Sequence, residues 1–142
     1  MAQTTFSPTP NVTTHGDATV VINNNASDAE SRLASIEAKF TQQTITSSSG
    51  ALGLNTDNGN YAIVTLTENI SDFTISNASA GDNGLVVVRQ DSNGGWTFST
   101  SHEVAGGFLS DISSVTINSV GYITVSWYFD GSNYYLFISE PK

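Results

Sequence analysis

The sequence predicts a mainly β protein, with a compact antiparallel β-sandwich or barrel head preceded by a short helical neck and an extended N-terminal arm. Short apolar or alternating runs, separated by turn residues, fill residues 61–142. One stretch, residues 26–40, has the caps and spacing of an amphipathic helix. Residues 1–25 are polar and contain too few apolar side chains to bury a core.

The predicted head contains seven short runs with the residue types of strands. Glycine- and asparagine-containing turns separate them, and Asp130-Gly131-Ser132-Asn133 is a strong hairpin signal between the last two. Runs of this number and spacing are typical of a sandwich or barrel. The seven predicted strands are Tyr61–Thr67, Ser71–Asn77, Leu85–Gln90, Trp96–Thr100, Ser114–Asn118, Tyr122–Phe129 and Tyr134–Ser139.

Residues 26–40 are predicted to form a helix with a capping box at its start. Ser27 is a favourable N-cap, and Glu30 follows it at capping-box spacing. Asp28 and Arg32 form a favourable i,i+4 pair, and Lys39 lies in the last turn, where the helix dipole favours a positive charge. Residues 41–60 are rich in Ser, Thr, Asn and Gly and are expected to form a linker.

Apolar residues in and before this helix follow a heptad pattern that indicates a parallel coiled coil. Leu33 at position a and Ile36 at position d favour oligomers larger than dimers. Arg32 at g and Glu37 at the next e are placed for a salt bridge between chains. The alternative is a single helix that packs on its own domain. The d–a–d–a–d–a positions of the predicted trimer neck are Ile22, Ala26, Ala29, Leu33, Ile36 and Phe40.

The N-terminal arm, residues 1–25, has two interpretations. It is either a disordered tail or an arm that becomes ordered on a partner surface. The short apolar stretch Ala18–Ile22 could pair as a strand. If the arm binds a partner surface, its contact residues are expected to be Phe6, Pro8, Pro10, Val20 and Val21.

The last two predicted strands carry aromatic residues on both faces. Because side chains alternate along a strand, one set points inward and consists of Ile123, Val125, Trp127, Phe129, Tyr134, Leu136 and Ile138. The other set would form an apolar patch of a kind that monomers rarely leave exposed. That patch is either a subunit interface, which is favoured, or a surface on which sugar rings stack. Its residues are Tyr122, Tyr128, Tyr135 and Phe137.

Composition and charge argue against several classes of function. Charged residues make up 12% of the chain, against about 25% in ordinary soluble domains, while 50 of 142 residues are Ser, Thr or Asn. This composition is typical of an extracellular or virion surface. The net charge is −9, and the four basic residues are scattered, which argues against partners such as nucleic acid or an anionic membrane. The N-terminus lacks the basic start and apolar stretch of a signal peptide.

The sequence contains no recognisable catalytic or metal-binding motif, so neither enzymatic activity nor a cofactor is expected. His15 and His102 are isolated, and Glu103 beside His102 does not complete an H-E-x-x-H motif. The segment 55–60, "NTDNGN", lacks the spacing of a calcium-binding loop and is expected to form an Asx-type turn.

Residues 61–139 resemble the small trimeric β-domains of bacteriophage fibre and capsid-decoration proteins. The similarity lies in "VTLTENISDFTISNASAGDNGLVVVRQDSNGGWTFS" and "YITVSWYFDGSNYYLFIS". Its most specific parts are the 66–70 stretch, the Gly81–Gly84 turn, the 88–91 stretch, the Gly94-Gly95 turn and the 129–135 hairpin. Trp96 departs from the pattern, because these domains often have a basic residue there.

The resemblance implies a non-enzymatic protein on the surface of a phage particle, assembled as a homotrimer. We expect it to be a capsid decoration (cement) or head-fibre protein, with the arm bound to the major capsid protein and the neck setting the trimer register. The alternative is the tip of a tail fibre that recognises glycans on the host surface.

Overall fold

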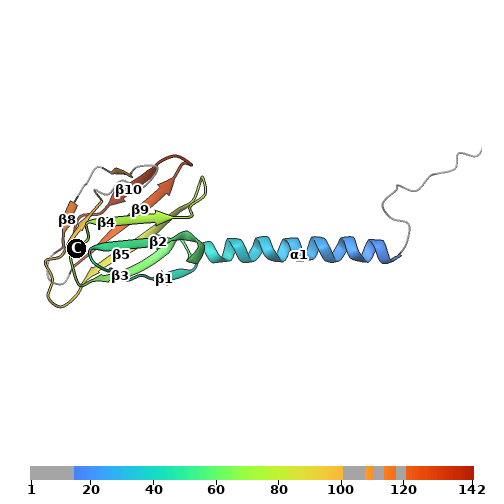
Figure 1. The fold of residues 1–142 in the computed structure, drawn as a ribbon, viewed down its shortest axis with the longest axis horizontal. Helices are drawn as coiled ribbons and strands as arrows, with labels where there is room; N and C mark the ends of the chain where they lie inside the picture. The colour runs from blue at the N-terminus through green and yellow to red at the C-terminus, as the bar shows by residue number, and fades with distance from the viewer. Residues whose placement is uncertain (1–14, 101–107, 111–113, 118–120) are drawn as a thin grey trace, which may run out of the picture. The chain divides into compact units, whose positions relative to one another are not determined.

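The computed structural model describes residues 15–100, 108–110, 114–117 and 121–142 (Figure 1). Side chains are described from residue 23 onward, except at 108–110. The chain divides into two compact units, one up to Glu37 and one from Ala38 to Lys142. Most of the helix lies in the first unit. All the strands lie in the second unit, which we call the head.

Helix α1 spans His15–Lys39, so it begins well before the predicted start at residue 26. The predicted capping box at Ser27 and Glu30 is therefore wrong, as are the strand at 18–22 and the extended arm over residues 15–25. The Asn run and the β-branched residues before it cost only a few tenths of a kcal/mol each in a helix, roughly 0.7 at most. No proline interrupts the segment, so the helix continues through it. The predicted pair Asp28–Arg32 is present, with 4.0 Å between Oδ2 and Nη1.

All seven predicted runs form strands, and three further strands were not predicted. The predicted ones are β3 (Tyr61–Leu66), β4 (Asp72–Ser76), β5 (Asn83–Gln90), β6 (Thr97–Ser99), β8 (Ser114–Thr116), β9 (Tyr122–Phe129) and β10 (Tyr134–Ile138). The additional strands are β1 (Gln42–Thr44), β2 (Ala51–Asn55) and β7 (Phe108–Ser110), and a 3-10 turn, η1, spans Thr56–Asn58.

The sheets are mixed, which corrects the predicted antiparallel arrangement. One six-stranded sheet has the order β1-β3-β5-β9-β10-β7, and two small sheets pair β2 with β4 and β6 with β8. Along the first half of the head the chain alternates between the six-stranded sheet and the β2–β4 sheet. Strands of the same sheet are therefore separated by a crossover and run parallel, as in β1–β3, β3–β5 and β2–β4. No sheet closes into a barrel within the described residues.

The predicted linker 41–60 contributes to the folded head. Leu52 and Leu54 on β2 are 1% and 0% exposed and pack in the hydrophobic core. They alternate with Ala51, Gly53 and Asn55, so β2 does have the period of a half-buried strand. The glycine and the neighbouring serines lower the strand propensity, which is why the segment was expected to be a linker.

Buried apolar side chains from all three sheets form one continuous core. Its largest fully buried side chains are Trp127 and the tilted ring pair Phe73–Phe98, whose centroids are 5.3 Å apart. Tyr134 donates its hydroxyl to the carbonyl of Ile75, at 3.3 Å. The predicted inward set is confirmed for β9 and β10, although Phe129 is only half-buried and stacks on Tyr134 with 4.3 Å between the ring centroids.

Candidate functional site: outward-facing apolar side chains

The neck residues whose side chains are described lie on an exposed helix. Residues 23–37 of α1 are all exposed, and the exposed fractions of Leu33 and Ile36 are 55% and 57%. Ala26 and Ala29 are exposed as well, whereas the side chain of Ile22 lies outside the described residues. Large aliphatic side chains at heptad spacing therefore face solvent in a single chain. Such a helix gains stability when partner helices cover it.

The four outward residues of β9 and β10 are placed as predicted. Tyr122, Tyr128 and Phe137 are 45%, 42% and 63% exposed, and Tyr135 is half-buried. The rings of Tyr128 and Tyr135 lie side by side on neighbouring strands, with centroids 6.1 Å apart. This orientation was predicted from the two-residue period. A role as an interface remains a prediction.

Strand registers extend this surface across the six-stranded sheet. The residues of this sheet that face away from the core form neighbouring rows, and we call three of these rows together the outer sheet face. They are Asn83–Tyr128–Tyr135, then Gln42–Tyr61–Leu85–Ser126–Phe137, then Thr44–Ile63–Val87–Thr124. A fourth row, Thr65–Arg89–Tyr122, introduces a charge at one end.

Phe40 connects the heptad pattern to this face. It is the last residue of the predicted neck, it is 70% exposed, and it belongs to the head unit. Its ring stacks on that of Tyr61, with 6.4 Å between centroids and 18° between planes. The heptad pattern thus ends in an aromatic contact on the outer sheet face.

Four apolar residues of this face were missed at the sequence level: Tyr61, Ile63, Leu85 and Val87. Each is half-buried and lies on a strand whose alternate residues are in the core. The signal that could have revealed them is that β3 and β5 are apolar on both faces. A strand with one solvated face normally alternates apolar and polar residues.

The β9–β10 turn is held by Asp130, which confirms the predicted hairpin. Its Oδ1 accepts backbone N–H groups of Ser132 and Asn133, each at 2.7 Å, and its Oδ2 accepts the hydroxyl of Tyr135 at 3.0 Å. Gly131 adopts φ 102°, a conformation that favours glycine. The hydrogen bonds from Asn133 and Ser132 lower the pKa of Asp130 below its ordinary value of 3.8. The hydrogen bond from the Tyr135 hydroxyl to Asp130, together with the negative charge of Asp130, raises the pKa of Tyr135.

We expect Asp130→Asn to remove a pH dependence from this turn. A carboxyl whose pKa is lower in the folded chain contributes stability above its unfolded pKa and loses that contribution as pH falls through the folded pKa. In the wild type, the amide resonances of Ser132 and Asn133 should therefore shift as the pH is lowered below 3.8, and in the variant they should not. Amides of Asn93 and Gly94, which donate to Asp91, serve as the control and should titrate in both proteins. Persistent titration of Ser132 and Asn133 in the variant would contradict the assignment.

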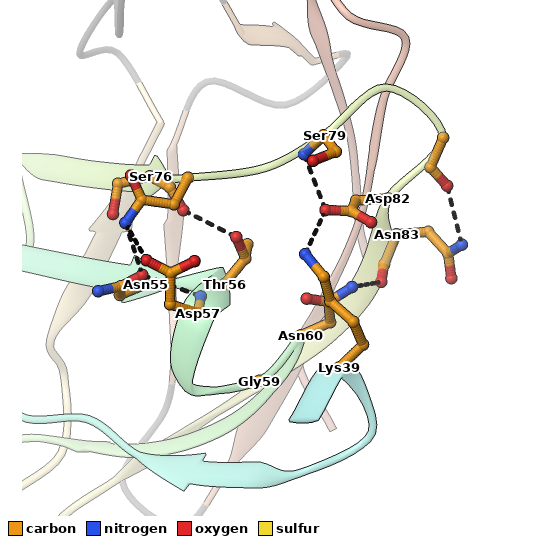
Figure 2. Close-up of polar contacts among 12 residues, drawn as sticks. Lys39, Asn55, Thr56, Asp57, Gly59, Asn60, Ser76, Ser79, Asp82 and Asn83 are labelled. Atoms are coloured by element: carbon orange, nitrogen blue, oxygen red, sulfur yellow. Dashed lines mark hydrogen bonds and ion pairs between the residues drawn. The ribbon is translucent and has the colours of Figure 1, made fainter. Parts of the chain in front are cut away.

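Polar contacts anchor the C-terminal end of α1 within the head (Figure 2). Lys39 Nζ lies 2.7 Å from Asp82 Oδ2, which also accepts the backbone N–H of Ser79 at 2.8 Å. The carbonyl of Lys39 accepts the backbone N–H of Asn60 at 3.0 Å. Lys39 therefore makes a partly buried ion pair in addition to its predicted position in the last helical turn.

The segment 55–60 forms the expected Asx-type turn. Oδ1 of Asn55 accepts the backbone N–H of Asp57 at 3.0 Å and caps η1. Asn77, with φ 63°, donates its side-chain amide to Asn55 and Asp57. These contacts tie two loops together and account for the Asn- and Asp-rich composition of the segment.

The described residues contain no cluster of three or more His, Asp or Glu side chains that could hold a metal ion. No helix in the described part of the chain is both long and apolar enough to cross a membrane. His102, Glu103 and the arm residues Phe6, Pro8 and Pro10 lie outside the described residues. Val20 and Val21 lie in α1 rather than in an extended arm.

Comparisons with known proteins gave no match to a family model, to a curated protein or to a solved structure.

Proposed function

We propose that this chain is a non-enzymatic structural protein of a bacteriophage virion. In this proposal it assembles as a homotrimer through a coiled-coil neck, its β-sandwich head projects from the particle, and its N-terminal residues bind the capsid. The observation that carries the trimer is the exposure of Leu33, Ile36 and Phe40 at heptad spacing. Side chains of this size stabilise an assembly by about 1.5–3 kcal/mol each when they become fully buried.

The placement on a virion is supported by composition and by the resemblance of residues 61–139 to phage trimeric β-domains. A surface rich in hydroxyl and amide groups, with few charges, suits an exposed component of a particle. The 25-residue helix is about 38 Å long, which is longer than predicted but short for a fibre that must reach from a tail to a host cell. We therefore favour a capsid decoration or head-fibre protein that contacts the major capsid protein.

Deletion of residues 2–14 tests the attachment. Because the deletion leaves α1 and the head intact, we expect a soluble oligomer of unchanged stoichiometry that no longer co-sediments with purified empty capsids. The full-length protein should bind capsids saturably and raise their resistance to heat or low salt. A variant with residues 2–14 in scrambled order controls for the length and composition of the segment.

A tail-fibre tip that binds host glycans is the second candidate. Tyr122 and Tyr128 are exposed and are suited to stacking on sugar rings. Tyr128 lies beside Tyr135, whose hydroxyl contacts the Asp130 carboxylate. Full-length protein that ignores capsids, co-sediments with purified tails and binds a glycan array would replace the capsid proposal with this one.

A further inference from the structure

The rows of the outer sheet face carry exposed aromatic rings and no charged side chain, although the Asp130 carboxylate at the β9–β10 turn accepts the hydroxyl of Tyr135 in the first row. The chain has 13 acidic and four basic residues, yet the three rows that define this face contain none of them. The nearest charged residue in the strand registers is Arg89, in the row that ends with Tyr122. Copies of a chain with a net charge of −9 repel each other, so a face whose rows contain no charged side chain favours contact between them.

The apolar area on this face is large enough to matter. Aromatic side chains bury about 150–250 Å² each, so the exposed fractions of Phe40, Phe137 and Tyr128 (70%, 63% and 42%) correspond to about 350 Å². Half-buried Ile63, Leu85 and Val87 add to this area. A stable interface needs about 800 Å² from each partner, and these six residues supply a substantial part of it.

We propose that the outer sheet face is a second interface between copies of this chain, centred on Ile63, Leu85 and Val87, through which the heads of the trimer contact one another. This inference rests on the proposed homotrimer. The occupant is a second copy because Phe40, the last residue of the heptad pattern in the sequence, stacks on Tyr61 within the face. Ser126, which lies between Leu85 and Phe137 in the middle row, is small enough to allow close approach of a neighbouring head. Tyr122, which was predicted to belong to the interface, lies at its charged end.

Thiol protection tests this interface in the full-length protein. The chain has no cysteine, so Ser126→Cys introduces a single, nearly isosteric thiol in the middle row of the face. Thr74→Cys on β4 is the matched control, because Thr74 is also half-buried on a strand and lies beside Gly53 on the outward side of the β2–β4 sheet. Each variant is treated with a bulky maleimide at a protein concentration at which its oligomeric state has been measured by light scattering.

In a verified oligomer we expect the thiol of the Ser126→Cys variant to react at least about tenfold more slowly than that of the Thr74→Cys variant, since a packed interface excludes the reagent. Adding Leu33→Asn and Ile36→Asn to dissociate the chains should bring the two rates together. An oligomer in which the thiols at positions 126 and 74 react equally fast would overturn the interface while leaving the homotrimer in place. A protein that is monomeric by light scattering would overturn the proposed assembly, and this inference with it.

Discussion

Leu33→Asn combined with Ile36→Asn is expected to dissociate the oligomer while the head remains folded. The two substitutions place amides at adjacent a and d positions, where a coiled coil would exclude water. Each buried amide without a partner costs about 1–3 kcal/mol, and the aliphatic contacts are lost as well. Over three chains, the apparent association constant should fall by at least about 1,000-fold.

The head should tolerate these changes because Leu33 and Ile36 are more than half exposed in a single chain. The β signal in circular dichroism should therefore persist while the sedimentation coefficient falls. Ser31→Asn with Ser35→Asn is the matched control, since it introduces the same two amides at the outward f and c positions of the heptad. If the a/d variant stays as tightly associated as the control, α1 does not organise the assembly.

Gly84→Ala is expected to cause a large loss of stability in the head. Gly84 lies on β5, where an added Cβ would be 1.9 Å from the carbonyl oxygen of Asn60 and 2.8 Å from Nε1 of Trp127. That carbonyl accepts the backbone N–H of Leu85, and the Asn60 side chain donates to the carbonyl of Asn83. Backbone and a buried indole must both move, so we expect a destabilisation of about 3 kcal/mol, against a typical total of roughly 5–15 kcal/mol.

Gly53→Ala is the control for this effect. Gly53 also lies on a strand, but its added Cβ would meet only the hydroxyl of Thr74, at 3.3 Å. Urea unfolding should show a clearly lower midpoint for Gly84→Ala and a midpoint close to wild type for Gly53→Ala. Equal midpoints for the two variants would show that the contact of β5 with Asn60 and Trp127 is not as tight as described.

The positions of seven strands and the buried faces of β9 and β10 could be predicted from the sequence, but the directions of the strands could not. The β9–β10 hairpin was predicted in detail, because Asp130-Gly131 specifies a tight turn and alternation specifies which residues are buried. A two-residue period carries no information on whether neighbours run parallel. The parallel pairing of β3 with β5 depends on β4 crossing to another sheet between them, which is a tertiary feature.

The start of the helix and part of the candidate site were missed for different reasons. Asn23, Asn24 and Asn25 favour caps and turns over helix interiors, so the helix was expected to begin after them. The stacking of Phe40 on Tyr61 and the rows that contain Leu85 and Val87 could not be predicted, because they depend on how segments distant in sequence pair with one another. The outward positions of Tyr122, Tyr128, Tyr135 and Phe137 needed only local alternation, and these were predicted.

The molar mass of the full-length protein in solution tests the central claim most directly. Multi-angle light scattering at micromolar concentration should give three times the chain mass of 15.0 kDa. The same measurement on the Leu33→Asn, Ile36→Asn variant should give a value close to one chain mass. A clean 15.0 kDa species for the wild-type protein would contradict the trimer and, with it, the proposed role of the neck and the outer sheet face.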